Sequence, residues 1–353
     1  KANIFYFDVI FSDITTNIGS YAIMIKYVII DKSRKEISMF KSRMLDNVNL
    51  SRYIPPIWLA VLISIGFIQV GEILAFIGMI PIGIIIGTVL AMVNPTADRA
   101  TVMEVFGHYG IFFQLGSFFF MALLVFLWVK FREKRPFSSL GFFKEGWLKE
   151  LGKGFLIGSI QFSLIVALLL LTGSGRLEFA ELGLEPVLFI LALIPFWILQ
   201  GGTEELVTRG WLFPAVSAKS NILVGVLVSS TLFGAMHLLN AGVTVLSIVT
   251  IILDGIFACL LMIKYDNMWV LAGMHGAWNF VQGNVYGIQV SGQGASTSIL
   301  NYSSQSSVDL LSGGAFGAEG SIFASIVLIG CIAYLYWSLK KENRLPQALM
   351  FKK

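Results

Sequence analysis

Long runs of apolar residues, separated by short polar segments, organise this chain. A helix needs about 20 apolar residues to cross the hydrocarbon core of a membrane. Seven runs have roughly this length, and each predicts one transmembrane helix: residues 109–131, 152–172, 186–216, 221–239, 243–263, 269–286 and 321–339. An eighth run, residues 56–93, is interrupted by Glu72 and Pro81. It therefore predicts either two short spans or one span followed by a kinked or interfacial helix.

Basic residues between the apolar runs predict the orientation. Residues 130–135 and the tail 340–353 are rich in Lys and Arg, whereas residues 174–185 are acidic and residues 287–320 contain no Lys or Arg. Basic loops lie on the cytoplasmic side of membrane proteins. We therefore predict an all-α, multi-pass transmembrane bundle of about eight spans with both termini in the cytoplasm. Nine spans are the alternative if the run 56–93 crosses twice.

The same pattern divides the chain into segments. Residues 1–55 form an N-terminal segment that does not begin with Met, and Met39 or Met44 could be the natural start. Part of this segment is therefore expected to be an extension, and we assign it no function. The remaining segments are N-terminal membrane helices (56–173) with a cytoplasmic amphipathic segment (132–151), a helical core (186–287), an external Ser/Gly-rich loop (288–320), a last span (321–339) and a basic cytoplasmic tail (340–353).

Composition agrees with a membrane protein. The chain is 56% hydrophobic and 13% charged, whereas a soluble domain carries about 25% charged residues. The net charge of +4 does not indicate nucleic-acid binding, because the basic residues lie in loops beside the apolar runs. Cys259 and Cys331 both lie inside apolar runs, which predicts buried thiols rather than a disulfide framework. The expected surroundings are membrane lipids, with no nucleic-acid partner.

Three pairs of residues in the apolar runs share one internal spacing. They are Glu205 with Arg209, Phe233 with His237, and His275 with Asn279, and Glu204 precedes the first pair. Residues four apart lie on the same face of a helix, so each pair is directed one way. Ionisable residues within membrane spans are costly and usually functional.

These groups are also predicted to lie at similar depth. At 1.5 Å per residue, Glu204 and His237 lie about 22 and 27 Å from the turn between their helices, and Asn279 lies about 20 Å from its own turn on the same side. The polar side chains can therefore converge within a bundle. This prediction requires the helix of residues 186–216 to continue through Arg209, and Pro214 is its weakest point.

Activation of water is the chemistry that suits such a set. Glu204 could accept a proton from water while His237 orients it. His275 and Asn279 could donate hydrogen bonds to the oxyanion of a tetrahedral intermediate.

Two other interpretations stay open. Glu204, His237 and His275 would suit a zinc ion with one open position, although no His-Glu-x-x-His segment is present. Glu205 and Arg209 could instead form a structural ion pair.

Three further polar residues carry weaker signals. His108 lies in a predicted loop, and Glu72 is an isolated acid in an apolar run whose polarity fits helix packing. Asp254 lies in the middle of a predicted span and needs a partner, but none can be identified from the sequence.

Together, the segments EELVTR (204–209), FGAMH (233–237) and HGAWN (275–279) resemble the CPBP family of CAAX proteases and bacteriocin-processing enzymes, formerly called Abi. The pattern of this family is EExxxR, then FxxxH, then HxxxN or HxxxD, and all three motifs match in order. The resemblance covers about residues 186–287. It implies a multi-pass intramembrane endopeptidase that hydrolyses a peptide bond of a membrane-associated peptide or protein.

The resemblance also implies roles for individual residues. Glu204 corresponds to the catalytic glutamate and His237 to its partner in activating water, while His275 and Asn279 correspond to the pair beside the oxyanion. Glu205 and Arg209 complete the first motif.

Phe233 and Trp278 belong to the second and third motifs and are expected to contact the substrate. The family has been described both as metal-dependent and as glutamate-dependent, so zinc remains open. Prokaryotic members process bacteriocins and peptide pheromones, which implies a bacterial cell membrane.

Other classes of function remain as alternatives. A non-catalytic immunity or peptide-binding membrane protein could use the same fold. A proton-coupled transporter could also use buried Glu and His residues, although the chain has no visible internal repeat.

Overall fold

The computed structural model describes residues 42–94, 98–294 and 297–350. The expected extension therefore lies almost entirely outside the described residues. The first half contains α2 (Arg43–Asn47), η1 (Val48–Leu50), α3 (Ile57–Val93), α4 (Arg99–Gly116), α5 (Phe118–Leu127), η2 (Trp128–Glu133), η3 (Phe137–Leu140), α6 (Trp147–Leu171) and β1 (Gly175–Phe179). The second half contains α7 (Leu184–Glu205), η4 (Leu206–Leu212), α8 (Phe213–Lys219), α9 (Ile222–Ala235), α10 (Val245–Tyr265), α11 (Met268–Phe280), η5 (Val281–Val285), β2 (Leu300–Ser304), α12 (Asp309–Ser312), η6 (Gly314–Phe316), η7 (Ala318–Gly320), α13 (Ile322–Lys341) and η8 (Gln347–Leu349).

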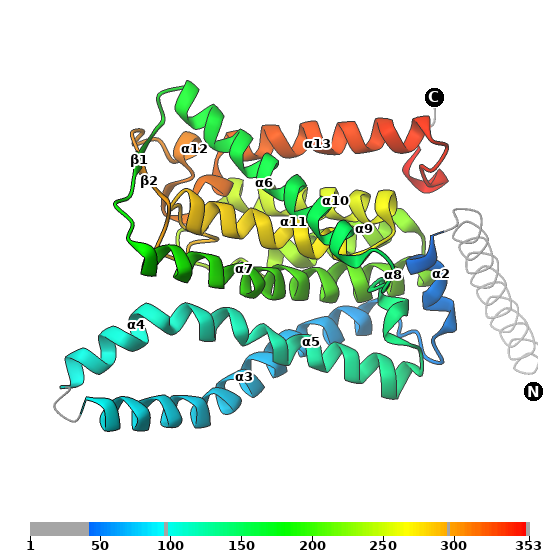
Figure 1. Cartoon of the computed structure of the whole chain (residues 1–353). Coiled ribbons are helices and arrows are strands. Elements are labelled where there is room, and N and C mark those ends of the chain that lie inside the picture. Colours follow the sequence, from blue (N-terminus) through cyan, green and yellow to red (C-terminus); the bar gives the residue numbers. More distant parts are fainter. Residues whose placement is uncertain (1–41, 95–97, 295–296, 351–353) are drawn as a thin grey trace, which may run out of the picture.

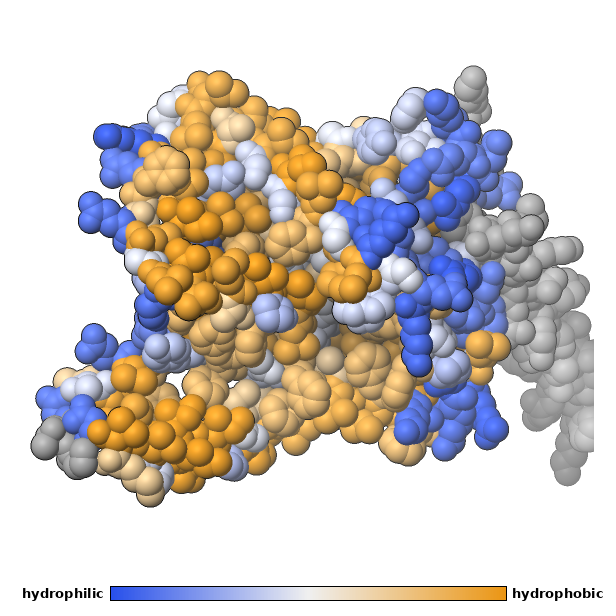
Figure 2. All heavy atoms as spheres, viewed as in Figure 1, coloured by the Kyte–Doolittle hydropathy of each residue, from blue (hydrophilic) through white to orange (hydrophobic). Residues whose placement is uncertain are grey.

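Apolar helices account for most of the molecule. Within the described residues, six helical segments are long and apolar enough to cross a membrane, counting α4 to η2 and α7 to α8 as one segment each. Figure 2 shows an apolar belt between two ends that carry hydrophilic residues. The protein is therefore an all-α, multi-pass membrane protein, as predicted. The number of about eight spans remains a prediction, and reaching it would require the shorter helices α9 and α11 to cross as well.

The N-terminal membrane helices begin with one long helix. The run 56–93 forms the single helix α3, with Pro81 inside it, rather than two short spans. The predicted polar loop after it is also shorter, because α4 already begins at Arg99, where the Asp98 side chain caps the helix. Lipid cannot form hydrogen bonds with free backbone N–H and C=O groups. A helix that continues through a proline is therefore favoured over a break in the helix. In Figure 1, the second half of α3 and the first half of α4 diverge from the other helices.

The helix α11 lies at the centre of the bundle, packed against α6 and α7. Glycines allow these backbones to approach closely. A Cβ atom on Gly158 of α6 would lie 2.0 Å from the carbonyl oxygen of Met274, and a Cβ atom on Gly201 of α7 would lie 2.7 Å from the backbone nitrogen of Gly276. Small residues are the usual means of close helix packing in membranes. The second contact brings the end of α7 directly against the His275 region of α11.

The two predicted external loops are joined to each other. Strand β1 pairs antiparallel with β2, with Gly175 opposite Ser304 and Phe179 opposite Leu300. The segment 288–320 was predicted as a loop, but it also contains α12 and the short turns η6 and η7. Backbone pairing between residues so far apart leaves no periodic signal in a Ser/Gly-rich sequence. This segment covers one end of the bundle near β1 (Figure 1).

The opposite end holds buried charges. The predicted amphipathic segment 132–151 contains the end of η2, the short turn η3 and the start of α6 at Trp147. Glu133 pairs with Arg135 at 2.5 Å and accepts a hydrogen bond of 2.6 Å from the Trp211 indole, and these side chains are almost fully buried. Buried charges are tolerated when they are paired in this way. The contact anchors η4, which carries part of the candidate site.

Candidate active site

The helix that carries the first motif runs unbroken from Leu184 to Lys219, but it changes form. Glu204 and Glu205 end α7, and Arg209 lies in the π-helical segment η4. In that segment the Phe213 N–H donates to the Thr208 carbonyl five residues earlier. The predicted convergence of the polar side chains required the helix to continue through Arg209, and it does.

Pro214 begins α8 rather than ending the helix. A proline has no N–H to donate to the carbonyl four residues before it. The wider π turn just before Pro214 accommodates this missing bond, and such turns are frequent at functional sites.

Glu205 is the centre of a buried ionic cluster. Its Oε1 atom lies 3.2 Å from Arg209 Nη1 and 2.9 Å from His275 Nδ1. The side chains of Glu205 and Arg209 are fully buried. Arg209 also donates to Thr208 Oγ1 at 2.7 Å and lies 4.3 Å above the ring of Phe233. The first motif therefore joins two helices, since Glu205 links η4 to α11.

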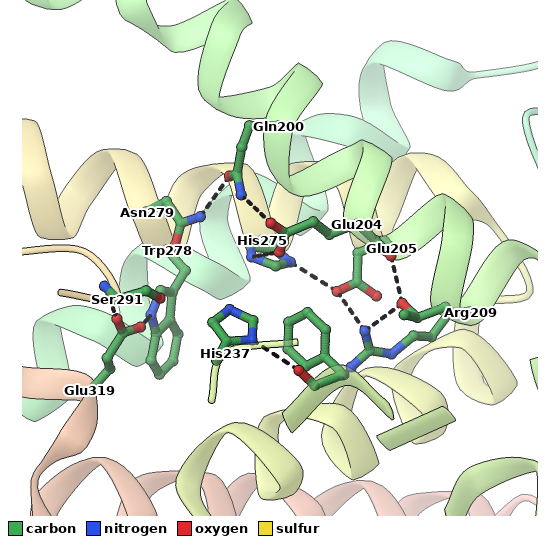
Figure 3. A network of polar contacts seen from close by, with 12 residues as sticks. Gln200, Glu204, Glu205, Arg209, His237, His275, Trp278, Asn279, Ser291 and Glu319 are labelled. Atoms are coloured by element: carbon green, nitrogen blue, oxygen red, sulfur yellow. Dashed lines mark hydrogen bonds and ion pairs between the residues drawn. The ribbon is translucent and has the colours of Figure 1, made fainter. Parts of the chain in front are cut away.

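Glu204 belongs to a second chain of contacts, which faces a cavity. Gln200 Nε2 donates to Glu204 Oε1 at 2.7 Å, and Asn279 Nδ2 donates to Gln200 Oε1 at 2.8 Å. The other oxygen, Glu204 Oε2, lies 3.6 Å from His275 Nε2. His275 thus stands between the two carboxylates (Figure 3).

The contacts of His275 determine where its protons lie. The carboxylate of Glu205 can only accept, so Nδ1 of His275 carries a proton and donates it. Nε2 is then directed to Glu204. Together, Glu204, Glu205 and Arg209 carry one negative charge when all are ionised. A second proton on His275 makes this buried cluster neutral, as a low-dielectric site favours.

His237 was predicted to lie on a helix, but it does not. The helix α9 ends at Ala235, and His237 occupies the turn that follows. Its Nδ1 atom lies 2.9 Å from the Phe233 carbonyl oxygen. Because a carbonyl only accepts, Nδ1 carries the proton, and Nε2 of the neutral ring is an acceptor. Figure 3 shows this ring opposite His275 and Glu204.

The two residues that are predicted to contact the substrate, Phe233 and Trp278, pack against different parts of the site. The ring of Phe233 is 5.0 Å from that of His237 and 5.8 Å from that of His275. Trp278 packs edge-on against Phe162, and its indole Nε1 donates to Glu319 Oε2 at 3.4 Å. Both residues line the same cavity as the motif residues.

This cavity has a volume of about 400 Å³. Its walls come from α3, α4, α5, α7, α9, α10, α11, η5 and α13, and from the segment between η5 and α13. Glu204, His237, His275 and Asn279 all line it, whereas Glu205 and Arg209 do not. The structure therefore brings the four predicted reactive groups to one space and places the Glu205–Arg209 pair behind them.

Two residues of the site were not predicted. Gln200 lies one helical turn before Glu204 and bridges it to Asn279; its spacing of four residues was a usable signal. Glu319 comes from η7, and besides the Trp278 contact its Oε1 accepts a hydrogen bond from the Ser291 backbone N–H. Burial raises the pKa of the Glu319 carboxyl. No sequence signal connects Glu319 to the motifs, because it lies far beyond them.

The predicted zinc ligands do not form a metal site as they are placed. In the part of the chain that the structure describes, no three His, Cys, Asp or Glu side chains are grouped so that they could hold a metal ion. Both ring nitrogens of His275 face carboxylates, whereas, among the described residues, His237 keeps Nε2 free because only its Nδ1 bonds to a backbone carbonyl. One free imidazole nitrogen does not supply the three protein ligands of a catalytic zinc site, so the donor set does not fit a zinc ion in this arrangement.

Comparison with known proteins agrees with the motifs. Residues 186–281 match the family described as type II CAAX prenyl endopeptidase Rce1-like. No curated protein and no solved structure matches the chain. The matched segment runs from α7 into η5 and contains all three motifs. Residues 186–281 of this membrane protein therefore form an Rce1-like domain of the CPBP family of CAAX-type proteases.

Proposed function

We propose that this protein is an intramembrane endopeptidase that hydrolyses a peptide bond of a membrane-associated peptide or protein. The observation that carries the proposal is the position of Glu204. Its carboxylate lines a cavity between the helices, one oxygen is held by Gln200, and the other faces His275. The proposal places the enzyme in a bacterial cell membrane, where it would process CAAX-type proteins or precursors of bacteriocins or pheromones.

In the proposed reaction, Glu204 is the general base. It removes a proton from a water molecule while His237 Nε2 accepts a hydrogen bond from the same water. The water oxygen forms a bond to the carbonyl carbon of the scissile peptide, and the carbonyl oxygen becomes an oxyanion. Glu204 then returns the proton to the leaving nitrogen as the C–N bond breaks. One water molecule is consumed, and a carboxylic acid and an amine are released.

His275 and Asn279 are proposed to stabilise the oxyanion. Nε2 of a doubly protonated His275 is a charged donor beside Glu204, and Asn279 supplies an amide N–H from the same face of α11. Donors that are held in place before the reaction stabilise developing charge without a cost of reorganisation. Glu205 and Arg209 act as positioning residues, since Glu205 holds the Nδ1 side of the His275 ring.

The test uses the purified full chain in proteoliposomes with a library of membrane-anchored peptides. Product masses identify the cleaved bond. Glu204→Gln keeps the shape of the side chain and removes the base, so kcat should fall by about 10²–10⁴-fold. His237→Ala should also lower kcat. Glu181→Gln, at an exposed acid outside the cavity, is the matched control and should leave kcat unchanged.

The alternative is a non-catalytic immunity or peptide-binding protein of the same fold. Such a protein would tolerate Glu204→Gln, because the amide preserves size and hydrogen bonding to Gln200. Cleavage of the library at the same rate by the parent, Glu204→Gln and His237→Ala would exclude the proposed mechanism. Loss of the cellular phenotype in normally expressed Glu204→Gln would argue against the non-catalytic alternative.

A further inference from the structure

The cavity beside the motifs has an uneven distribution of charge. Among the described residues that line it are four carboxylates, those of Glu72, Glu204, Asp254 and Glu319, and no Lys or Arg. Arg209 lies behind this wall with a fully buried side chain, and its Nη1 donates to Glu205 and Thr208. The only lining residues that can become cationic are His237 and His275. The space that a substrate would enter is therefore acidic.

Asp254 has no role in the mechanism proposed above, and it lacks a partner of its own. It lies on α10, is half-buried, and lines the cavity. Within the described residues, its carboxylate forms no hydrogen bond and no ion pair. The cations within its electrostatic range are His275 and Arg209, and both are already engaged by Glu205. An unpaired carboxylate at membrane depth is costly unless a cation joins it.

Glu319, which belongs to the segment 288–320, provides a second carboxylate on the wall of the cavity. The Ser291 N–H and the Trp278 indole hold its two oxygens, so the side chain has a defined position. It lies within electrostatic range of both Asp254 and His237. The two acids thus line the same space as His237, on elements different from those that carry Glu204.

We propose that the cavity binds a substrate segment that carries a cationic nitrogen beside the scissile bond, and that Asp254 and Glu319 recognise it. The inference rests on the proposed function, because it names the substrate class of the same site. A Lys or Arg side chain and a free N-terminal amine share this chemistry. The substrate peptide would then be selected by its charge as well as by its contacts with the apolar lining.

The first experiment compares matched peptides on the full chain in proteoliposomes. All peptides share one apolar anchor and one cleavable sequence, and they differ only at single positions flanking the cleaved bond, which carry Lys, Arg, Ala or Glu. A further pair has a free or an acetylated N-terminus near that bond, which distinguishes a side chain from a terminal amine. The best cationic peptide should exceed its Ala version in kcat/KM by about tenfold. Equal values for all peptides would overturn the inference.

The variants Asp254→Asn and Glu319→Gln test which carboxylates recognise the charge. Each should reduce the ratio of kcat/KM between the cationic and the Ala peptide, and Glu181→Gln should keep it. Glu181 is a suitable control because it is exposed in the segment that follows β1 and does not line the cavity. A ratio that stays unchanged in both cavity variants would contradict the assignment.

A binding measurement separates this inference from the proposed activity and leaves Asp254 and Glu319 unchanged. The Glu204→Gln protein is titrated with fluorescently labelled versions of the same peptides, and anisotropy gives Kd. Tighter binding of the cationic peptides, even if the parent protein cleaves none of them, would support the inference and refute the proposed protease function. Cleavage by the parent without any difference in Kd or kcat/KM would refute the inference and leave the protease function standing.

Discussion

At the scale of single residues, Glu205 determines the geometry of the site although it does not line the cavity. One of its oxygens contacts both Arg209 and His275, which joins η4 to α11. The other oxygen and two nitrogens of Arg209 have no hydrogen-bond partner among the described residues. The stacking of the guanidinium over Phe233 compensates part of this deficit. The pair is thus held by packing as much as by hydrogen bonds.

We predict that Glu205→Gln destabilises the protein by about 3–5 kcal/mol, because it leaves the buried Arg209 charge without a counterion. Reversible unfolding in mixed micelles measures this change. The double variant Glu205→Gln with Arg209→Met should recover part of the loss, since no uncompensated charge remains. A double variant less stable than the single variant would show that the ion pair does not account for the effect.

The other residues of the site show how much could be predicted from motifs. The shared spacing pointed to His275 and Asn279, and to Glu204 beside the first pair, because residues on one helical face stay together whatever the tertiary packing. The same spacing placed His237 on a helix, although α9 ends before it. It could not identify Glu319, whose position depends on the path of a long segment. Its bond to Ser291 joins two parts of that segment that are close only in the fold.

At the scale of elements, the close contact of α6 with α11 positions the third motif. Gly154 and Gly158 lie one turn apart on α6 and face the carbonyl oxygens of Val270 and Met274. Met274 immediately precedes His275. A wider separation of these helices would displace His275 from the two carboxylates. The sequence predicted both spans, but neither apolar pattern indicates which of its glycines faces another backbone.

We predict that Gly158→Ala destabilises the protein by about 1–3 kcal/mol, because the added methyl group would overlap the Met274 carbonyl. Gly152→Ala, on the same helix, is the matched control. A Cβ atom there meets nothing within 4 Å, so the change should be neutral or slightly stabilising. Unfolding of both variants under the same conditions provides the measurement. Equal stability of the two variants would contradict the packing argument.

The helix of the first motif also shows what local pattern cannot specify. Its apolar run predicted a helix through residues 186–216, and the structure continues it to Lys219. The π-helical turn of η4 was not predicted. Its formation depends on Pro214 together with contacts from other elements, such as the hydrogen bond from Ser229 to the Thr208 carbonyl. Only tertiary contacts can decide between an interrupted helix and a widened turn.

At the scale of the whole molecule, the two ends of the bundle differ in charge. The basic tail extends α13 at the end that also holds the buried Glu133–Arg135 pair, and the paired strands β1 and β2 lie at the opposite end (Figure 1). The cavity is lined by residues of the segment that follows η5 and reaches inward to Glu204. With the predicted orientation, substrate would approach the acidic cavity from the external half of the bundle or through the lipid.

We predict that single cysteines at positions 134 and 306 lie on opposite sides of the membrane. They are introduced as Lys134→Cys and Ser306→Cys in a background without Cys259 and Cys331. A membrane-impermeant maleimide applied to intact cells should label position 306 and should label position 134 only after permeabilisation. Labelling of position 134 in intact cells would reverse the predicted orientation, because the basic segment would then be external.

The sequence alone determined the class of the molecule and predicted which groups are reactive. Apolar run length and motif spacing are local properties, and each predicts a helix and a shared face without knowledge of the fold. The tertiary structure decided everything that depends on contact between distant segments. It placed His275 between Glu204 and Glu205, moved His237 off its helix, and brought Asp254 and Glu319 to the same cavity. These positions depend on packing between helices, which no single segment encodes.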